Sequence, residues 1–239
     1  MSRSLAEQTV TELGGPGSVL ARQRRDHVEL DRLLRRLETT SGAEQDQVLN
    51  DVCRLVFSHA FAEEAVLWPA VRTALPDGEQ LTLRVEQEHQ EINELVRRLE
   101  GSRHTDPGRA ELLDRVVRLL DEDVRDEEDV VLPRLQAVLG PQELNRLGRS
   151  WQALRRTAPT RAHPGVSRRP PGNVLAALPL TLLDRSRDVL DGLARRAPSP
   201  VAPVAGAASA GLRGVADAVE RLAPLRHGEH DSTREGRTA

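Results

Sequence analysis

The sequence predicts an all-α protein: an antiparallel up-down-up-down four-helix bundle followed by a flexible, partly helical C-terminal extension. Three observations support this fold class. Apolar residues recur at steps of three and four through the first 140 residues, with almost none of the alternation that is typical of strands. The predicted helices are long and joined by short loops, which favours antiparallel neighbours. The composition then changes near residue 158.

Residues that favour helix ends bound the predicted helices. Ser18 precedes the first apolar stripe and is expected to be an N-cap. Pro107 suits the first position of the fourth helix, and Gly140-Pro141 ends that helix and begins a short fifth one. The expected helices span residues 18–40, 44–74, 78–101, 107–139 and 141–157.

Two regions of the chain differ in charge and composition. Residues 1–157 carry 22 arginines against 29 acidic residues, whereas residues 158–239 carry 12 against 8. We therefore expect a bundle domain over 1–157, with its core at 18–140, and an extension over 158–239. The extension is expected to contain a solvated Pro/Gly/Arg linker, a broken amphipathic helix, a low-complexity stretch, a short helix and a disordered end. These lie, in that order, at 158–172, 173–196, 198–211, 212–226 and beyond 226.

The composition excludes several classes of protein. The 239 residues contain no run of 18 uncharged apolar residues, which rules out a transmembrane helix. The first residues lack the apolar segment of a secretory signal, and the single cysteine, Cys53, cannot form an intramolecular disulfide, so we expect a cytoplasmic protein. A net charge of -3 and 2% aromatic residues leave little with which to bind nucleic acid. We expect neither a nucleic-acid nor a membrane partner.

The chain also repeats itself. DHVELDRLLRRLETT at 26–40 matches EHQEINELVRRLEGS at 88–102, and LVFSHAFAEEAVLWPAVRTAL at 55–75 matches LLDEDVRDEEDVVLPRLQAVL at 119–139. Paired glutamates and a Trp/Leu-Pro step recur at matched positions, which argues against chance similarity between Arg- and Leu-rich helices. Two copies of one helical hairpin therefore form the four predicted helices. Pro69 and Pro133, one in each copy, are expected to kink their helices.

Ionisable residues interrupt the apolar stripe of every predicted helix. Each stripe is apolar except for one or two imidazoles or carboxylates near its middle. Burial of even one unpaired carboxylate is costly, and no arginine lies in the stripes to pair with these. The six residues are His27, His59, Glu63, His89, Asp123 and Glu127.

A bound metal explains this set of residues. His59 and Glu63 are four residues apart on one helix, as are Asp123 and Glu127, so the side chains of each pair lie on one face about 6 Å apart at Cβ. Two such pairs, with one histidine from each remaining helix, can enclose one or two metal ions. Mixed imidazole and carboxylate donors suit iron, with manganese or zinc as alternatives. A lone inward histidine is more often a hydrogen-bonded core residue, but the two-fold repetition favours metal.

The same residues lie in segments that resemble a known family. D-H-V-E-L, S-H-A-F-A-E-E-A-V-L-W-P, E-H-Q-E-I and E-D-V-R-D-E-E-D-V-V-L-P are similar to the four motif segments of the hemerythrin-like HHE cation-binding domain, over residues 18–140. The resemblance implies a four-helix bundle holding a non-haem, usually di-iron centre with bridging carboxylates. It implies that His27, His59, Glu63, His89 and Glu127 are ligands, with Glu63 and Glu127 as the bridges.

Two positions depart from that family's pattern. The last histidine of the pattern is Asp123 here, a harder and shorter donor that can still ligate. Oxygen-carrying hemerythrins have a second histidine one turn after the third-helix ligand, where this chain has Asn93. The resemblance therefore argues against a reversible oxygen carrier.

Together with the donor set, the resemblance implies a non-haem iron protein, with two iron ions, that handles or senses oxygen, peroxide or nitric oxide, or serves iron homeostasis or a stress response. Its ligand would be a small diatomic molecule or peroxide, and binding is favoured over enzymatic turnover. Two alternatives stay open. A ferritin-like di-iron carboxylate oxidase needs two E-x-x-H motifs, of which only Glu86 to His89 is present. A metal-free helical scaffold or regulator with a degenerate site is favoured by Asp123.

Two further groups of residues lie outside the apolar stripes. His163, with Arg161, Arg168 and Arg169, could bind an anion, but the surrounding Pro/Gly-rich sequence favours a solvated linker. His104 is expected to be exposed between the third and fourth helices.

Overall fold

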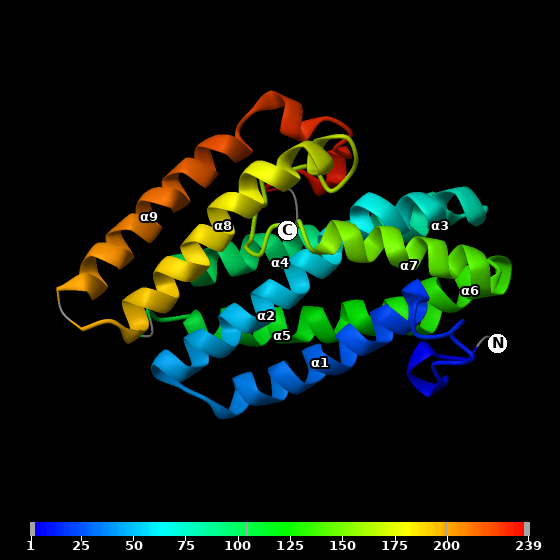
Figure 1. The fold of residues 1–239 in the computed structure, drawn as a ribbon, viewed down its shortest axis with the longest axis horizontal. Coiled ribbons are helices and arrows are strands. Elements are labelled where there is room, and N and C mark those ends of the chain that lie inside the picture. Colours follow the sequence, from blue (N-terminus) through cyan, green and yellow to red (C-terminus); the bar gives the residue numbers. More distant parts are fainter. Residues whose placement is uncertain (1–2, 104, 199, 237–239) are drawn as a thin grey trace.

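Four long helices run side by side as an antiparallel bundle (Figure 1). The computed structural model describes residues 3–103, 105–198 and 200–236, and it contains no strand in these ranges; His104 lies outside them. In the bundle α1 (Val19–Thr39) packs on α2 (Gly42–Ala62), and α4 (Gly78–Gly101) packs on α5 (Arg109–Asp126). The prediction of an all-α protein with a four-helix bundle is confirmed.

The second and fourth predicted helices are each interrupted by a π-helical turn. After α2 the chain forms such a turn at Glu63–Leu67 and continues as α3 (Trp68–Ala74). After α5 it forms the matching turn at Glu127–Val131 and continues as α6 (Leu132–Val138). The two turns lie at matched positions of the sequence repeat, so the repeat extends to an unusual backbone conformation.

Pro69 and Pro133 follow these turns directly, so the expected proline kinks take the form of π-helical turns. The backbone N–H of Trp68 donates to the carbonyl of Glu63, five residues back, and Leu132 donates to Glu127 in the same way. A proline lacks the N–H for a regular helix bond, and its ring crowds the carbonyl four residues before it. The wider turn accommodates the proline while the helix continues.

The predicted helix ends are partly confirmed. The Ser18 side chain accepts a hydrogen bond from the Leu20 N–H, as an N-cap does. Gly140 precedes α7 (Pro141–Arg155), with Pro141 at its first position. The fourth helix, however, begins at Arg109 rather than at Pro107, because Gly108 takes a left-handed conformation with a φ of 85°.

The six predicted residues lie between two apolar clusters. One cluster is formed by residues such as Leu34, Val52, Val96 and Leu119. The other contains Trp68 and Trp151, with residues from the start of α1, the end of α2, the first half of α4 and α7. In every bundle helix the ionisable residues fall between the stretches that form these clusters. The fold therefore places the polar layer inside the bundle rather than at one end.

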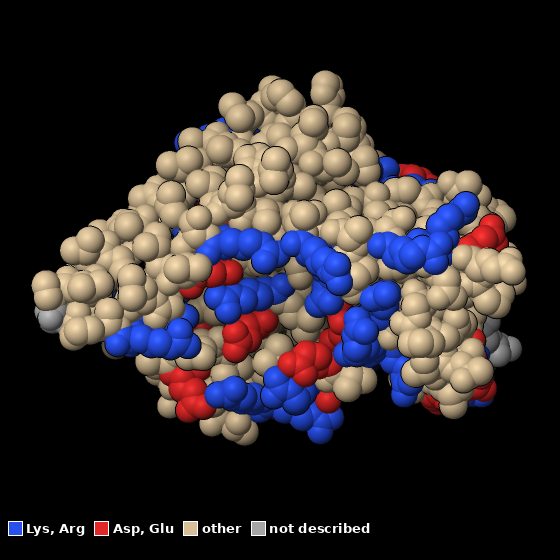
Figure 2. All heavy atoms as spheres, in the orientation of Figure 1, with Lys and Arg blue, Asp and Glu red and all other residues tan. Residues whose placement is uncertain are grey.

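The extension forms a helical hairpin against the bundle. Its helices, α8 (Gly172–Arg196) and α9 (Val201–Glu220), pack on one another and are yellow and orange in Figure 1. Figure 2 shows few charged side chains over this hairpin and a band of arginines and acidic residues beneath it. None of the described helices combines the length and the apolar character that crossing a membrane requires.

The hairpin differs from the expected order of the extension. The Ala/Gly/Pro-rich stretch, expected as a linker over 198–211, is part of α9, which buries Ala205 and Ala216. The short helix expected over 212–226 is the second half of α9 together with a 3₁₀ turn at Ala223–Arg226. Small side chains permit this packing on α8, which composition alone does not show. Of the expected disordered end, residues 227–236 are described and residues 237–239 are not.

The segment between α7 and α8 is not the expected solvated linker. Ala158, Ala162, His163 and Val166 are all buried. The N–H of His163 donates to Oδ1 of Asn93 in α4, and the imidazole lies 3.0 Å from Asp184 and 2.7 Å from Glu220. Acidic groups on the hairpin thus partner the polar groups of this segment, which allows it to be buried.

A glycine in α7 tests this packing. A Cβ on Gly148 would lie 2.1 Å from the Gly17 carbonyl oxygen, whereas one on Gly211 in α9 would meet nothing within 4 Å. We expect Gly148→Ala to lower the free energy of unfolding by about 1–3 kcal/mol. The control, Gly211→Ala, should raise it by about 0.5–1 kcal/mol. Urea denaturation measures both, and equal effects would contradict the close approach of α7 to α1.

Candidate metal centre

The side chains of all six predicted residues meet inside the bundle. They form two overlapping groups in which the candidate ligand atoms lie within 4.8 Å of one another. Every residue in both groups is buried. The first group is His27, His59, Glu63 and Glu127; the second is His89, Asp123 and Glu127.

Two glutamates face both groups. Glu63 places Oε1 at 3.0 Å from Nε2 of His59 and Oε2 at 3.8 Å from Nε2 of His89. Glu127 places Oε2 at 3.2 Å from Nε2 of His27 and Oε1 at 4.0 Å from Nε2 of His89. Both glutamates begin the π-helical turns, so the unusual backbone carries the two carboxylates that lie between the histidines. Such turns are frequent at functional sites.

Several carboxylate oxygens of this cluster have no hydrogen-bond partner among the described residues. These are both oxygens of Glu63, Oε1 of Glu127 and Oδ1 of Asp123, all of them buried. The 3.0 Å contact between His59 and Glu63 lacks hydrogen-bond geometry. Buried carboxylate oxygens without partners are costly. The donor set therefore fits bound cations, which would satisfy these oxygens and the facing imidazole nitrogens together.

Each histidine also contacts a carboxylate through its other ring nitrogen. Nδ1 of His27 lies 2.8 Å from Glu128, Nδ1 of His59 lies 3.2 Å from Asp26, and Nδ1 of His89 lies 3.0 Å from Glu64. A neutral imidazole that donates its Nδ1 proton outward presents an unprotonated Nε2 inward. Metal-binding histidines usually have such an outer partner, which fixes the tautomer and the ring orientation.

Sequence reasoning missed these three outer carboxylates, although the sequence contains a signal for them. Asp26 directly precedes His27, and Glu64 and Glu128 are the second members of the paired glutamates in the two repeats. Each lies beside a predicted residue but contacts a histidine on another helix. A rule that assigns the second glutamate of each pair to a histidine of the neighbouring helix would have found two of them.

Two other elements reach this outer layer. From α7, a terminal nitrogen of Arg155 lies 2.9 Å from Asp26, and the Trp151 ring packs edge-on against His59 at 5.4 Å between centroids. From the segment before α8, Arg168 approaches Glu64 to 3.7 Å. The fifth helix and the extension therefore support the carboxylates that orient His59 and His89.

Without metal, protons balance the charges of this cluster. Burial disfavours the imidazolium of His27, but contacts with Glu127 and Glu128 raise its pKa to about 10. Burial likewise opposes a charged His59, and Glu63 and Asp26 raise its pKa to about 9. Burial, followed by the charge of Glu63, raises the pKa of Glu127 to about 8. Metal ions would displace protons held by these groups.

The two repeats differ at one contact. Asp26 and His59 in the first repeat correspond to Glu88 and Asp123 in the second. A carboxylate therefore faces a carboxylate where the first repeat pairs a carboxylate with an imidazole. Burial and then the Asp123 charge raise the pKa of Glu88, and its Oε2 is buried without a hydrogen bond among the described residues. Asp123 thus leaves Glu88 without the partner that the repeat would supply.

A small cavity lies against the histidines. Its volume is about 20 Å³, and both polar side chains and leucine and valine side chains border it. A cavity needs roughly 10–15 Å³ to hold a water molecule. The space therefore suits one small molecule next to the cluster. Its lining includes His27, His59, His89, Asp123, Leu30, Val56 and Leu120.

The outer carboxylates provide a test of the site. Replacing Glu128 by Gln removes the charge that orients His27, and we expect metal affinity to fall by about 10–100-fold. The control is Glu122→Gln, an exposed position on α5 outside the cluster. Competition with a chelator of known affinity measures both variants. Identical affinities would show that Glu128 does not support a metal ligand.

Comparison with known proteins gives an independent assignment. The Hemerythrin family, described as the hemerythrin HHE cation binding domain, matches residues 18–135. An uncharacterized hemerythrin-like protein of Schizosaccharomyces pombe is 24% identical over 134 residues, which are 56% of this chain and 66% of that protein. The chain thus spans slightly less than two thirds of this relative's length, and no solved structure matches. Through residues 18–135, the chain belongs to the hemerythrin HHE cation-binding domain family.

Proposed function

We propose that the six clustered residues hold a non-haem di-iron centre, through which the protein binds or senses oxygen, peroxide or nitric oxide. One observation carries the proposal. Glu63 directs one carboxylate oxygen toward His59 and the other toward His89. Glu127 likewise directs one oxygen toward His27 and the other toward His89. Carboxylates in this position can bridge two cations.

The donor set supports iron as the metal. Three imidazoles and three carboxylates make a mixed nitrogen and oxygen environment, which suits iron and is compatible with manganese or zinc. Bound iron would supply open coordination positions and one-electron chemistry. The protein's own residues orient the imidazoles through Asp26, Glu64 and Glu128 and enclose the centre between apolar clusters.

The adjoining cavity supports a small ligand. At about 20 Å³ it accommodates a molecule the size of water or a diatomic gas, not an organic substrate. Leu30, Val56 and Leu120 also line the cavity, so an apolar diatomic molecule would find favourable contacts there.

The position of Asn93 supports a role other than reversible oxygen transport. Its side-chain nitrogen donates to the His89 carbonyl, and its oxygen accepts from the His163 N–H. Both polar atoms of the side chain are thus engaged in backbone contacts, one of which holds the extension. The residue that replaces the carriers' second histidine has a structural task here.

Contacts of Glu86 argue against the ferritin-like alternative. In an E-x-x-H site this residue would bind metal together with His89. Here Glu86 forms ion pairs with Arg72 and Arg169, on the side of α4 that faces α3 and the extension. Its carboxylate is already neutralised, so we assign it no place in the metal centre.

Metal analysis decides between this proposal and a metal-free scaffold. Purified full-length protein reconstituted with ferrous iron should contain two iron ions per chain. Mössbauer spectra before and after peroxide addition should show a coupled pair of ions that changes with the oxidant. The absence of stoichiometric metal would favour the scaffold, in which the buried carboxylates would be balanced by protons.

The effect of metal on stability should depend on pH. The folded-state pKa values of His27, His59 and Glu127 are raised to about 10, 9 and 8 in the metal-free cluster. A raised pKa contributes stability at a pH below the unfolded value, near 6.5 for histidine and 4.5 for glutamate, and the contribution is lost as the pH rises through the folded value. The chelated protein should therefore melt at progressively lower temperature from pH 6 to pH 9.

Bound metal replaces these protons, so the metal-loaded protein should lose less stability over the same range. The difference in melting temperature between loaded and chelated protein should widen toward pH 9. Scanning calorimetry at several pH values measures it. A difference that narrows as the pH rises would contradict the assignment of these residues as ligands.

Asp123 should set the reduction potential of the centre. Replacing it with histidine removes a negative charge beside the metal and supplies Glu88 with an imidazole. We expect Asp123→His to raise the potential by tens of millivolts or more, about 60 mV corresponding to about 1.4 kcal/mol for one electron. Iron occupancy should stay equal or increase. The matched variant Asp123→Asn removes the charge without adding an imidazole, and redox titration with iron analysis compares the three proteins.

The chelated forms supply a second readout. Asp123→His should also raise the melting temperature of the metal-free protein, because it relieves the repulsion between Asp123 and Glu88. Unchanged potential, occupancy and metal-free stability would together show that Asp123 does not belong to the cluster.

A further inference from the structure

A second pocket, lined by none of the six clustered residues, lies where the connected end of the α8–α9 hairpin meets the bundle. Its volume is about 470 Å³, within the range of small-molecule sites. It is bordered by the start of α2, the end of α4, the start of α5 and both hairpin helices. Five arginines line it against three acidic residues, Asp46, Glu100 and Asp191. The arginines are Arg109, Arg161, Arg187, Arg195 and Arg213.

One of these arginines is buried without adequate partners. The Arg187 side chain is 5% exposed, and its Nε is buried and unbonded. Its closest carboxylates are Glu100 at 3.7 Å and Asp184 at 3.9 Å, beyond hydrogen-bond distance. Asp184 already accepts hydrogen bonds from the backbone N–H groups of Thr160 and Arg161. A buried guanidinium with five donors requires acceptors, and neither of these two carboxylates lies within hydrogen-bond distance of Arg187.

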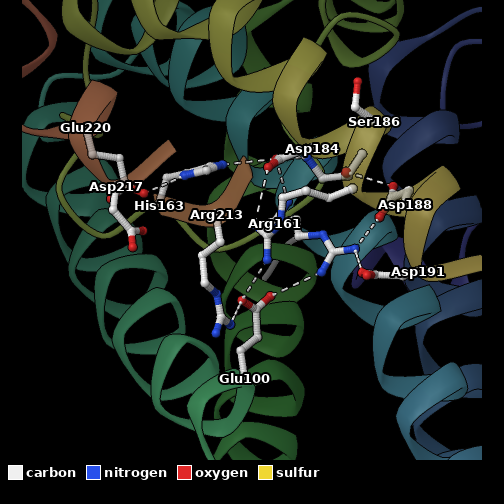
Figure 3. A network of polar contacts seen from close by, with 12 residues as sticks. Glu100, Arg161, His163, Asp184, Ser186, Asp188, Asp191, Arg213, Asp217 and Glu220 are labelled. Carbon is white, nitrogen blue, oxygen red and sulfur yellow. Dashed lines mark hydrogen bonds and ion pairs between the residues drawn. The ribbon is translucent and has the colours of Figure 1, made fainter. Parts of the chain in front are cut away.

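Arg187 belongs to a group of arginines that share a carboxylate, in a pocket lining where arginines outnumber acidic residues by five to three. Glu100 is shared by three guanidiniums, since Arg213 lies at 2.6 Å, Arg187 at 3.7 Å and Arg161 at 3.9 Å. Figure 3 shows Arg161 and Arg213 converging on Glu100 from different elements. Arg161 is neutralised separately by Asp188 and Asp191, each at 2.7 Å. Arg187 and Arg213 therefore share Glu100, and Arg187 has only Asp184, at 3.9 Å, as a further carboxylate within 4 Å among the described residues.

The pocket is open because α9 lines it with small residues. Gly206, Ser209 and Ala210 form that wall. A Cβ at Gly206 would meet nothing within 4 Å, so the space beside this glycine is empty. The guanidiniums of Arg187 and Arg213 thus border space that a ligand can occupy.

We propose that this pocket binds a phosphate group, free or as the monoester of a small organic molecule, through Arg187 and Arg213. Guanidinium donors match the geometry of phosphate oxygens and form charge-assisted hydrogen bonds with them. A phosphate near neutral pH carries close to two negative charges, which match the difference between the five arginines and the three acidic residues of the pocket lining. The volume exceeds that of a phosphate alone and leaves room for an organic part. This site is separate from the metal centre and does not depend on the proposed function.

Calorimetric titration of the metal-loaded full-length protein tests the proposal. Inorganic phosphate and ribose 5-phosphate are titrated separately at pH 7.5, with ionic strength held constant by sodium chloride. We expect saturable binding. Tighter binding of ribose 5-phosphate would assign the site to a phosphate monoester, and equal binding would assign it to free phosphate.

Variants locate the binding site. Arg187→Met should weaken binding at least about tenfold, because it removes charged hydrogen bonds. Arg213→Met, at a side chain that is only partly buried, should do the same and covers the case in which Arg187→Met does not fold. The control is Arg196→Met, an exposed arginine on α8 that does not line the pocket. Iron content should be equal in all four proteins.

Two results would overturn the proposal. One is a titration that does not saturate with either phosphate compound. The other is a loss of binding in Arg196→Met as large as in the folded Arg213→Met protein, which would show attraction to net charge instead of a pocket.

Discussion

The burial of three carboxylates inside an apolar bundle is the constraint on which the rest of this structure depends. Glu63, Asp123 and Glu127 present oxygens that no described group hydrogen-bonds, and desolvation makes that arrangement costly unless cations or protons compensate. The surrounding structure is arranged around this layer. Apolar clusters lie on both sides of it, and outer carboxylates orient the histidines toward it. The polar layer therefore relates the stability of the fold to the chemistry of the site.

The internal repeat explains both the symmetry of the centre and its one defect. Each repeat contributes a π-helical turn that begins with a central glutamate, and the second glutamate of each pair contacts a histidine of the other repeat. The symmetry fails where Asp123 replaces an imidazole and leaves Oε2 of Glu88 without a hydrogen bond among the described residues. One substitution thus changes the charge, the donor type and the outer layer in one half of the centre.

The extension is coupled physically to the centre. Asn93 lies one turn after His89 and holds the backbone of His163, while Arg168 approaches Glu64, the outer partner of His89. The segment between α7 and α8, which contains Arg168, also provides Arg161, and Arg161 lines the second pocket. A short stretch of chain therefore contacts the outer layer of the metal centre near one end and the second pocket near the other. Its burial requires the acidic residues of α8 and α9, which pair with its histidine and arginine.

The sequence by itself determined the helical bundle and the six clustered residues, because both follow from local periodicity and repetition. An imidazole or carboxylate in an apolar stripe is visible along one helix, and its recurrence in every stripe places the residues in one layer. Only the tertiary structure decided which carboxylate meets which Nδ1, since those contacts cross between helices. It also decided that residues 158–171 pack against the bundle: their composition resembles that of a solvated linker, and only the acidic partners on a distant hairpin make their burial favourable.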